Sequence, residues 1–225
     1  MECTGAKACV AVGSYFKDSV KAQVPLAASW NGKAWRLQPV PAPAQTSYSQ
    51  LYGVSCVRRA FCSAVGSDVL TSERWITLAE VWRGKRWEIT PTPPLESASH
   101  NSLRAVSCSS PADCMAVGSA DEATVPHPTG QPDSSLTAVA CSTAHRCKAV
   151  GEYFTKTGPI DTFAESWNGR TWVLQPTVNP SETNNSLSGL ACTSATACTA
   201  VGGYAGPESV SLSLIERYSA AQPRA

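Results

Sequence analysis

Apolar residues recur at short intervals along the chain, in runs that resemble one another. Two clear copies, residues 51–56 and 103–108, place apolar side chains at alternating positions before a cysteine. A period of two is typical of a β-strand that buries one face, whereas an amphipathic helix has a period of about 3.6. Each run therefore predicts a short strand.

A second run follows each cysteine after a loop of five residues, and it contains Ala-Val-Gly. The five copies of this tripeptide begin at Ala11, Ala64, Ala116, Ala149 and Ala200. Small residues that return at one place predict a crowded second strand. The glycine then supplies either a positive φ angle or room for a neighbouring backbone to approach closely.

Third and fourth strands are expected on either side of a turn dipeptide. The dipeptides are Asn31-Gly32, Arg83-Gly84 and Asn168-Gly169. Asn-Gly between apolar runs is typical of a type I′ hairpin with a two-residue loop. Such a loop would place Trp167 opposite Arg170 and Glu165 opposite Trp172, with all four side chains on one face.

The paired tryptophans of these hairpins have two possible roles. We expect both indoles to be buried between neighbouring sheets, with the basic residue lying along the ring. The alternative is a solvent-facing aromatic platform for sugars. Glu80, Glu165 and Glu216 recur at one position of the third strand, and we expect them to pair with Lys85 or Arg170 across the hairpin.

All ten cysteines fall into pairs that are separated by five residues. The pairs are Cys3/Cys9, Cys56/Cys62, Cys108/Cys114, Cys141/Cys147 and Cys192/Cys198. Zinc sites favour two to four intervening residues and usually recruit histidine, of which the chain has three. The spacing therefore predicts five local disulfides, which persist only in an oxidising compartment and so imply a secreted or cell-surface protein.

The cysteine pairs return about every fifty residues, except between the third and fourth pairs, and four strand signals per such period are the mark of a β-propeller blade. We predict a single all-β, β-propeller-like domain over residues 1–225, with about five blades and a disulfide in each. The repeats span about 1–45, 46–98, 99–133, 134–181 and 182–225.

Three of these repeats depart from the pattern. The third lacks the Trp-Asn-Gly-x-x-Trp segment and is truncated, the first lacks most of its first strand, and the fifth lacks its fourth strand. The start of the chain has no signal-peptide pattern, so we expect a mature segment or a piece of a longer precursor. A ring with such gaps would suit binding better than catalysis, because catalysis needs rigid walls.

The connector in the third repeat is the one place where potential ligand residues gather in sequence. They are Asp121, Glu122, His127 and Asp133. Three prolines and a glycine in this segment favour a disordered connector, and a metal or ligand site is the alternative. His100 and His145 also lie on expected connectors, where we predict solvated side chains.

Composition and missing motifs narrow the function further. A net charge of +1 without a basic stripe argues against nucleic acid as a partner. No apolar run approaches the roughly 18 residues of a membrane span, no Gly-rich phosphate loop indicates a cofactor, and no Gly-x-Ser-x-Gly elbow is present. The carboxylates are scattered along the repeats, whereas a glycosidase needs two close together.

The repeat resembles those of a family of secreted actinobacterial β-propeller-like proteins, mostly of unassigned function. The resemblance rests on Ser-Leu-x-x-Val-Ser-Cys, Cys-x-Ala-Val-Gly and Glu-x-Trp-Asn-Gly-x-x-Trp, and it implies the fold and export rather than an activity. We therefore expect an exported binding or interaction module whose partner is an unidentified protein or glycan at the cell surface. A carbohydrate-active enzyme or lectin of the sialidase or glycosidase type is the alternative.

Overall fold

The computed structural model describes residues 1–44, 46–93, 100–120 and 134–219. These residues form an all-β structure with one short 3-10 helix, η1 (Pro207–Ser209). The chain divides into two compact units, Met1–Glu122 and Ala123–Ala225, and each is described by itself. The all-β prediction is confirmed, and the single-domain arrangement stays a prediction.

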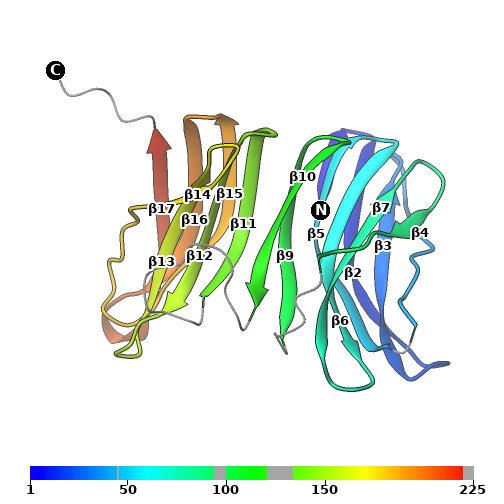
Figure 1. The fold of residues 1–225 in the computed structure, drawn as a ribbon, viewed down its shortest axis with the longest axis horizontal. Coiled ribbons are helices and arrows are strands. Elements are labelled where there is room, and N and C mark those ends of the chain that lie inside the picture. Colours follow the sequence, from blue (N-terminus) through cyan, green and yellow to red (C-terminus); the bar gives the residue numbers. More distant parts are fainter. Residues whose placement is uncertain (45, 94–99, 121–133, 220–225) are drawn as a thin grey trace. The chain divides into compact units, whose positions relative to one another are not determined.

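The first unit contains two four-stranded antiparallel meanders and a hairpin (Figure 1). The first meander consists of β1 (Glu2–Gly5), β2 (Ala8–Lys17), β3 (Ala22–Trp30) and β4 (Trp35–Gln38). The second consists of β5 (Thr46–Arg58), β6 (Phe61–Leu70), β7 (Trp75–Trp82) and β8 (Trp87–Ile89). The hairpin consists of β9 (Asn101–Ser110) and β10 (Asp113–Ala120), and β9 contacts β5, β6 and β7 of the second meander.

The second unit repeats the same plan with a four-stranded and a three-stranded antiparallel sheet. The fourth repeat forms β11 (Ser134–Thr143), β12 (Arg146–Phe154), β13 (Ile160–Trp167) and β14 (Trp172–Gln175). The fifth repeat forms β15 (Asn185–Ser194), β16 (Ala197–Ala205) and β17 (Ser211–Ser219). Each strand of a sheet pairs with its neighbour in sequence, as the four strand signals of the repeat predict.

One parallel residue pair links consecutive repeats in both units. Gln23 of β3 pairs with Tyr48 of β5, which joins the first two meanders into one eight-stranded sheet. Ile160 and Asn184 form the equivalent parallel bridge in the second unit. The same parallel pair therefore links the first repeat to the second and the fourth repeat to the fifth.

The core of each unit lies where neighbouring repeats pack against each other. In the first unit it contains Ala27, Leu51, Val54, Cys62, Ala64, Leu78 and Trp87. In the second unit it contains Ala138, Val150, Ala164, Leu187, Ala200 and Leu214. Several of these residues are alanines of the second and third strands, and their small side chains let neighbouring sheets approach closely.

The glycine of Ala-Val-Gly is required by close backbone approach. A Cβ atom built on Gly66 would lie 1.8 Å from the carbonyl oxygen of Gln50 in the paired strand, where the register shifts between Leu51 and Gly53. Gly118, Gly151 and Gly202 meet a carbonyl oxygen in the same way, at 1.9, 2.0 and 1.9 Å. None of the four has a positive φ angle, which decides between the two explanations offered by the sequence.

The hairpin between the third and fourth strands has four loop residues, so the predicted two-residue loop is wrong. Trp167 lies opposite Trp172, and Glu165 lies opposite Leu174. The Asn168 Oδ1 atom accepts hydrogen bonds from the backbone N–H groups of Arg170 (2.9 Å) and Thr171 (3.0 Å), which fixes the longer turn. Among the four residues of this loop, only Gly169 takes a positive φ angle, of 94°. The register moves by two residues, so both indoles stay on the predicted face and Arg170 moves into the loop.

Candidate functional site

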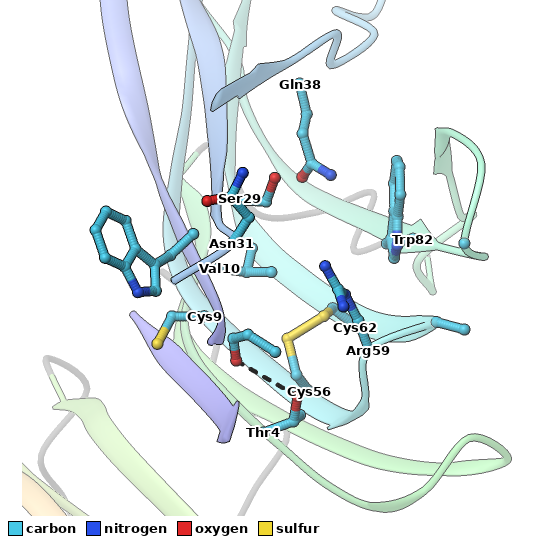
Figure 2. A pocket seen from close by; sticks show the side chains of 14 residues that line it. Thr4, Cys9, Val10, Ser29, Asn31, Gln38, Cys56, Arg59, Cys62 and Trp82 are labelled. Atoms are coloured by element: carbon cyan, nitrogen blue, oxygen red, sulfur yellow. Dashed lines mark hydrogen bonds between the residues drawn. A yellow bond between two sulfur atoms is a disulfide. The ribbon is translucent and has the colours of Figure 1, made fainter. Parts of the chain in front are cut away.

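A pocket of about 400 Å³ lies between the first and second meanders, at the end where their hairpin disulfides are. Its lining comes from the first meander (Thr4, Ala8, Cys9, Val10, Ser29, Trp30, Asn31, Gln38) and from the second (Cys56, Arg59, Ala60, Cys62, Trp82, Gly84). Figure 2 shows labelled side chains of both meanders around this space. We call it the Arg59 pocket.

Two amide side chains of the pocket use their oxygens within the protein. The Asn31 Oδ1 atom accepts hydrogen bonds from the backbone N–H groups of Lys33 and Ala34, at 2.9 and 3.0 Å. The Gln38 Oε1 atom accepts one from the Trp87 indole N–H at 3.0 Å. Neither amide NH₂ group donates a hydrogen bond within the described part of the chain, so both can donate to a ligand.

Arg59 adds a cation to this set of donors. It lies in the turn between β5 and β6, its side chain is exposed, and it forms no hydrogen bond or ion pair with the residues that the structure describes. A guanidinium binds a carboxylate through two parallel N–H donors. The pocket thus combines hydrogen-bond donors, an aromatic wall at Trp82 and one exposed positive charge.

The equivalent place in the second unit contains a lysine. Lys148 pairs with Ser166 across β12 and β13, as Val10 pairs with Ser29 across β2 and β3. The Lys148 Nζ atom donates a hydrogen bond to the Ser166 Oγ atom at 2.8 Å and lies 4.4 Å from the centre of the Tyr218 ring. Burial lowers the pKa of the Lys148 ammonium.

The buried carboxylates Glu80 and Asp68 are not among the residues that line the pocket. Glu80 shares the face of Cys62, Ala64 and Leu78 that packs on the first meander, and none of its surface is exposed. Desolvation, followed by the charge of Asp68, raises the pKa of Glu80 to about 8. Desolvation also raises the pKa of Asp68 to about 6, although the Ser49 hydroxyl opposes this rise.

The predicted pairing of the recurrent glutamates with Lys85 or Arg170 is wrong. Among the described residues, neither carboxylate oxygen of Glu80 or Glu165 has a hydrogen-bond partner, and desolvation raises the pKa of Glu165 to about 7. Glu216 differs, since it accepts hydrogen bonds from the Val178 backbone N–H (2.9 Å) and the Tyr218 hydroxyl (2.7 Å). All three glutamates are buried, so their carboxylates cannot contact a substrate from solvent.

The hairpin tryptophans are buried less completely than expected. Trp87 is 3 % exposed and fits the prediction, but Trp35 is 46 % exposed and the other four are half-buried. The two rings of each hairpin contact each other, with centroids 5.6 to 5.9 Å apart. The contacts between cations and aromatic rings in the described residues involve tyrosines, with Arg104 over Tyr52 and Lys148 over Tyr218. The prediction that a basic residue lies along the indole is therefore wrong.

The five predicted disulfides are present, one between the first two strands of each repeat. They join Cys3 to Cys9, Cys56 to Cys62, Cys108 to Cys114, Cys141 to Cys147, and Cys192 to Cys198. The candidate ligand residues Asp121, Glu122, His127 and Asp133 lie outside the described residues. His100 and His145 have exposed side chains.

A second pocket, of about 540 Å³, lies in the second unit and is lined by Glu152, Ile160, Thr183, Asn184, Asn185, Ser186, Gly203, Tyr204, Ala205 and Ser211. The Asn185 amide is its buried polar group, but hydrogen bonds to Ser181, Ile160 and Asp161 occupy it. This amide holds the loop before β15 and is not left for a ligand.

The repeat motifs include Trp30, Asn31 and Trp82, to which the sequence gives structural roles, but no pattern brings the pocket residues together as a site. Arg59 belongs only to an isolated basic pair with Arg58, and Ser29 and Gln38 occupy ordinary strand positions. One signal was present: the residue after the second cysteine is Val10 in the first repeat and Lys148 in the fourth. This position faces inward in both repeats. A charged residue in one repeat where the other has a small apolar residue indicates that the surroundings of the position differ between the two.

Two searches of the described residues gave negative findings. No group of three His, Cys, Asp or Glu side chains there could hold a metal ion. No helix in this part of the chain has the length and apolarity needed to cross a lipid bilayer. Comparison of the sequence with protein-family models and with curated proteins gave no match.

Proposed function

We propose that the chain is an exported β-propeller-like protein that binds a ligand in the Arg59 pocket. The antiparallel meanders and their regular parallel link support the propeller-like arrangement, with each meander as one blade. The five disulfides support export, because such bonds persist in oxidising compartments. The same repeats carry the resemblance to secreted actinobacterial proteins.

One observation carries the binding function: the pocket offers donors that the protein does not use. Arg59 is exposed and unpaired among the described residues, and Asn31 and Gln38 each have an NH₂ group to donate. The acids with raised pKa values, Asp68 and Glu80, are 1 % and 0 % exposed. Recognition through donors therefore fits this unit better than acid–base catalysis.

Carbohydrate recognition is the second candidate function, and Trp35 is the observation that favours it. Trp35 is 46 % exposed, and its ring contacts that of Trp30, so nearly half of this residue is open to solvent. Tryptophan is amphipathic and suits contact with a sugar ring. A Trp35→Ala variant that lost glycan binding while an Arg59→Gln variant kept it would favour this candidate.

The test uses two neighbouring arginines. The purified chain is screened by calorimetry against carboxylate-containing metabolites, peptides and glycans, and in parallel against glycoside and ester substrates. Arg59→Gln should weaken ligand binding about tenfold, as expected for the loss of a charge-assisted hydrogen bond worth about 1.5 kcal/mol. Arg58→Gln is the matched control, since Arg58 is exposed but does not line the pocket.

Two results would contradict the proposal. Turnover of a substrate that is abolished by one acidic substitution would make the chain an enzyme. Equal effects of Arg59→Gln and Arg58→Gln on every ligand would mean that binding takes place outside the Arg59 pocket.

A further inference from the structure

The two units of this chain place different groups at one repeated position, and the difference indicates what the Arg59 pocket can bind. Lys148 fills that position in the second unit with an ammonium group, which contacts Ser166 and the Tyr218 ring. In the first unit the three equivalent residues are Val10, Ser29 and Trp82, and all three line the Arg59 pocket.

The two residues that contact the Lys148 ammonium have close equivalents in the first unit. Ser29 provides the same hydroxyl as Ser166, from the same place opposite the second strand. Trp82 stands where Tyr218 stands, opposite the second cysteine of its repeat. Tryptophan binds a cation more strongly than tyrosine does. The first unit therefore keeps a hydroxyl and an aromatic ring for an ammonium group, but its own Val10 side chain is too short and apolar to supply one.

The rest of the pocket suits the opposite charge. Arg59, the Asn31 NH₂ group and the Gln38 NH₂ group are donors, and they come from turns and the β4 edge rather than from the β2 position of Val10. A cavity of about 400 Å³ has room for a ligand of several heavy atoms beyond the ammonium. An ammonium alone would leave Arg59 without a partner and close to a like charge.

We propose that the Arg59 pocket binds a small zwitterion, in which a primary ammonium and a carboxylate are joined by a short aliphatic chain. The ammonium donates to Ser29 and lies against Trp82, as the Lys148 ammonium does in the second unit. The carboxylate accepts hydrogen bonds from Arg59 and the amide groups. This assignment rests on the proposed binding function and specifies the class of its ligand.

The first experiment uses the unmodified chain and three probes of matched length. Calorimetric titration with 6-aminohexanoate, n-hexylamine and hexanoate should give the tightest binding for 6-aminohexanoate, about tenfold or more over either probe with one charge. A free lysine titration and a lysine-containing peptide then separate a small-molecule source of the ammonium from a polypeptide source. Binding of hexanoate as tight as that of 6-aminohexanoate would overturn the ammonium assignment.

The second experiment makes the first unit resemble the second. In the Val10→Lys variant the new side chain should reach Ser29 and Trp82 and compete with the ligand, so 6-aminohexanoate affinity should fall at least about tenfold. Val10→Met is the control, because methionine has a similar length without the charge. The Val10→Lys variant should melt at or above the temperature of the Val10→Met variant.

Two outcomes overturn this inference and leave the proposed function standing. One is a Val10→Lys variant that keeps full affinity, or that melts well below Val10→Met. The other is an unmodified chain that ignores all three probes but binds a different ligand in a way that depends on Arg59 and not on Arg58. Catalytic turnover, by contrast, would overturn the proposed function itself.

Discussion

Glu80 and Glu216 occupy one position of the repeat but have different surroundings. Glu80 is sealed against the first meander without a hydrogen-bond partner, whereas Glu216 accepts bonds from Val178 and Tyr218. Burial of a carboxyl group without partners strongly favours its protonated, neutral form over its charged form. The ionisation of Glu80 at alkaline pH should therefore destabilise the first unit.

The stability of the protein should fall as the pH rises from about 5 to 8.5, in the range set by Glu80. Burial raises the pKa of Glu80 in the folded protein to about 8, above the ordinary value of 4.5, so folding favours the protonated form. The stabilisation by Glu80 is fully present when the pH lies below the pKa that this residue has in the unfolded chain. It is lost as the pH rises through the pKa that Glu80 has in the folded protein. Chemical denaturation should show a loss of at least about 2 kcal/mol over this range, because one pKa unit corresponds to about 1.4 kcal/mol.

Glu80→Gln should make the slope of stability against pH shallower, and it should make the protein more stable than the unmodified chain at about pH 8.5. Part of the slope should remain, because burial also raises the pKa values of Asp68 and Glu165. Glu216→Gln is the contrasting variant, because it breaks a carboxylate that has partners and should destabilise the protein at neutral pH. Equal slopes of stability against pH in the Glu80→Gln variant and the unmodified chain would contradict this assignment.

At the scale of the element, the meander depends on a bulge in its first strand. The register of the first strand shifts near Gly53 and near Gly189, next to the glycine of the second strand. This shift brings a carbonyl oxygen over Gly66 and Gly202, where a side chain would collide with backbone. The glycine of Ala-Val-Gly is therefore required by a backbone contact within its own hairpin.

Gly66→Ala should destabilise the protein by about 3 kcal/mol or more, since backbone must move to accept the added methyl group. Gly13→Ala is the matched control. Gly13 is the same glycine in the first repeat, but no atom lies within 4 Å of its built Cβ position, so the change should be neutral or stabilise by about 0.5 kcal/mol. Thermal and urea unfolding of both variants checks the difference, and similar losses in the two would refute the close-approach explanation.

Across the whole molecule, one disulfide joins the first two strands of each repeat. Each bond closes a short loop, and the chain-entropy model assigns about 2 kcal/mol to a loop of this size. The bonds are spread over both units, so no single repeat carries the effect. The distribution suits a protein that must stay folded in an oxidising environment.

Reduction of the protein should therefore lower its melting temperature strongly and should release ten thiols. Mass spectrometry of a non-reduced digest should recover five peptide pairs, each linked within one repeat. Thiol titration of the native, unreduced protein is the control and should find none. A melting temperature that reductant leaves unchanged would mean that the sheets alone stabilise the fold.

The strands, the disulfides and the turn positions could be predicted from the sequence alone, because these features depend on residues that are close in the chain. Alternation of apolar residues defines a strand, and cysteines separated by five residues can meet only across a hairpin. The Asn-Gly turn was located correctly, but its length was not, since the Asn168 side chain stabilises a four-residue loop.

Only the tertiary structure decided what each repeated side chain faces. Val10 and Lys148 share one place in the repeat, yet one lines a pocket and the other lies over Tyr218. Glu80 was expected to pair with Lys85, but packing of the first meander against its face removed both water and partners. Charge, burial and access depend on the neighbouring sheet, and contacts between sheets join residues that are far apart in the sequence.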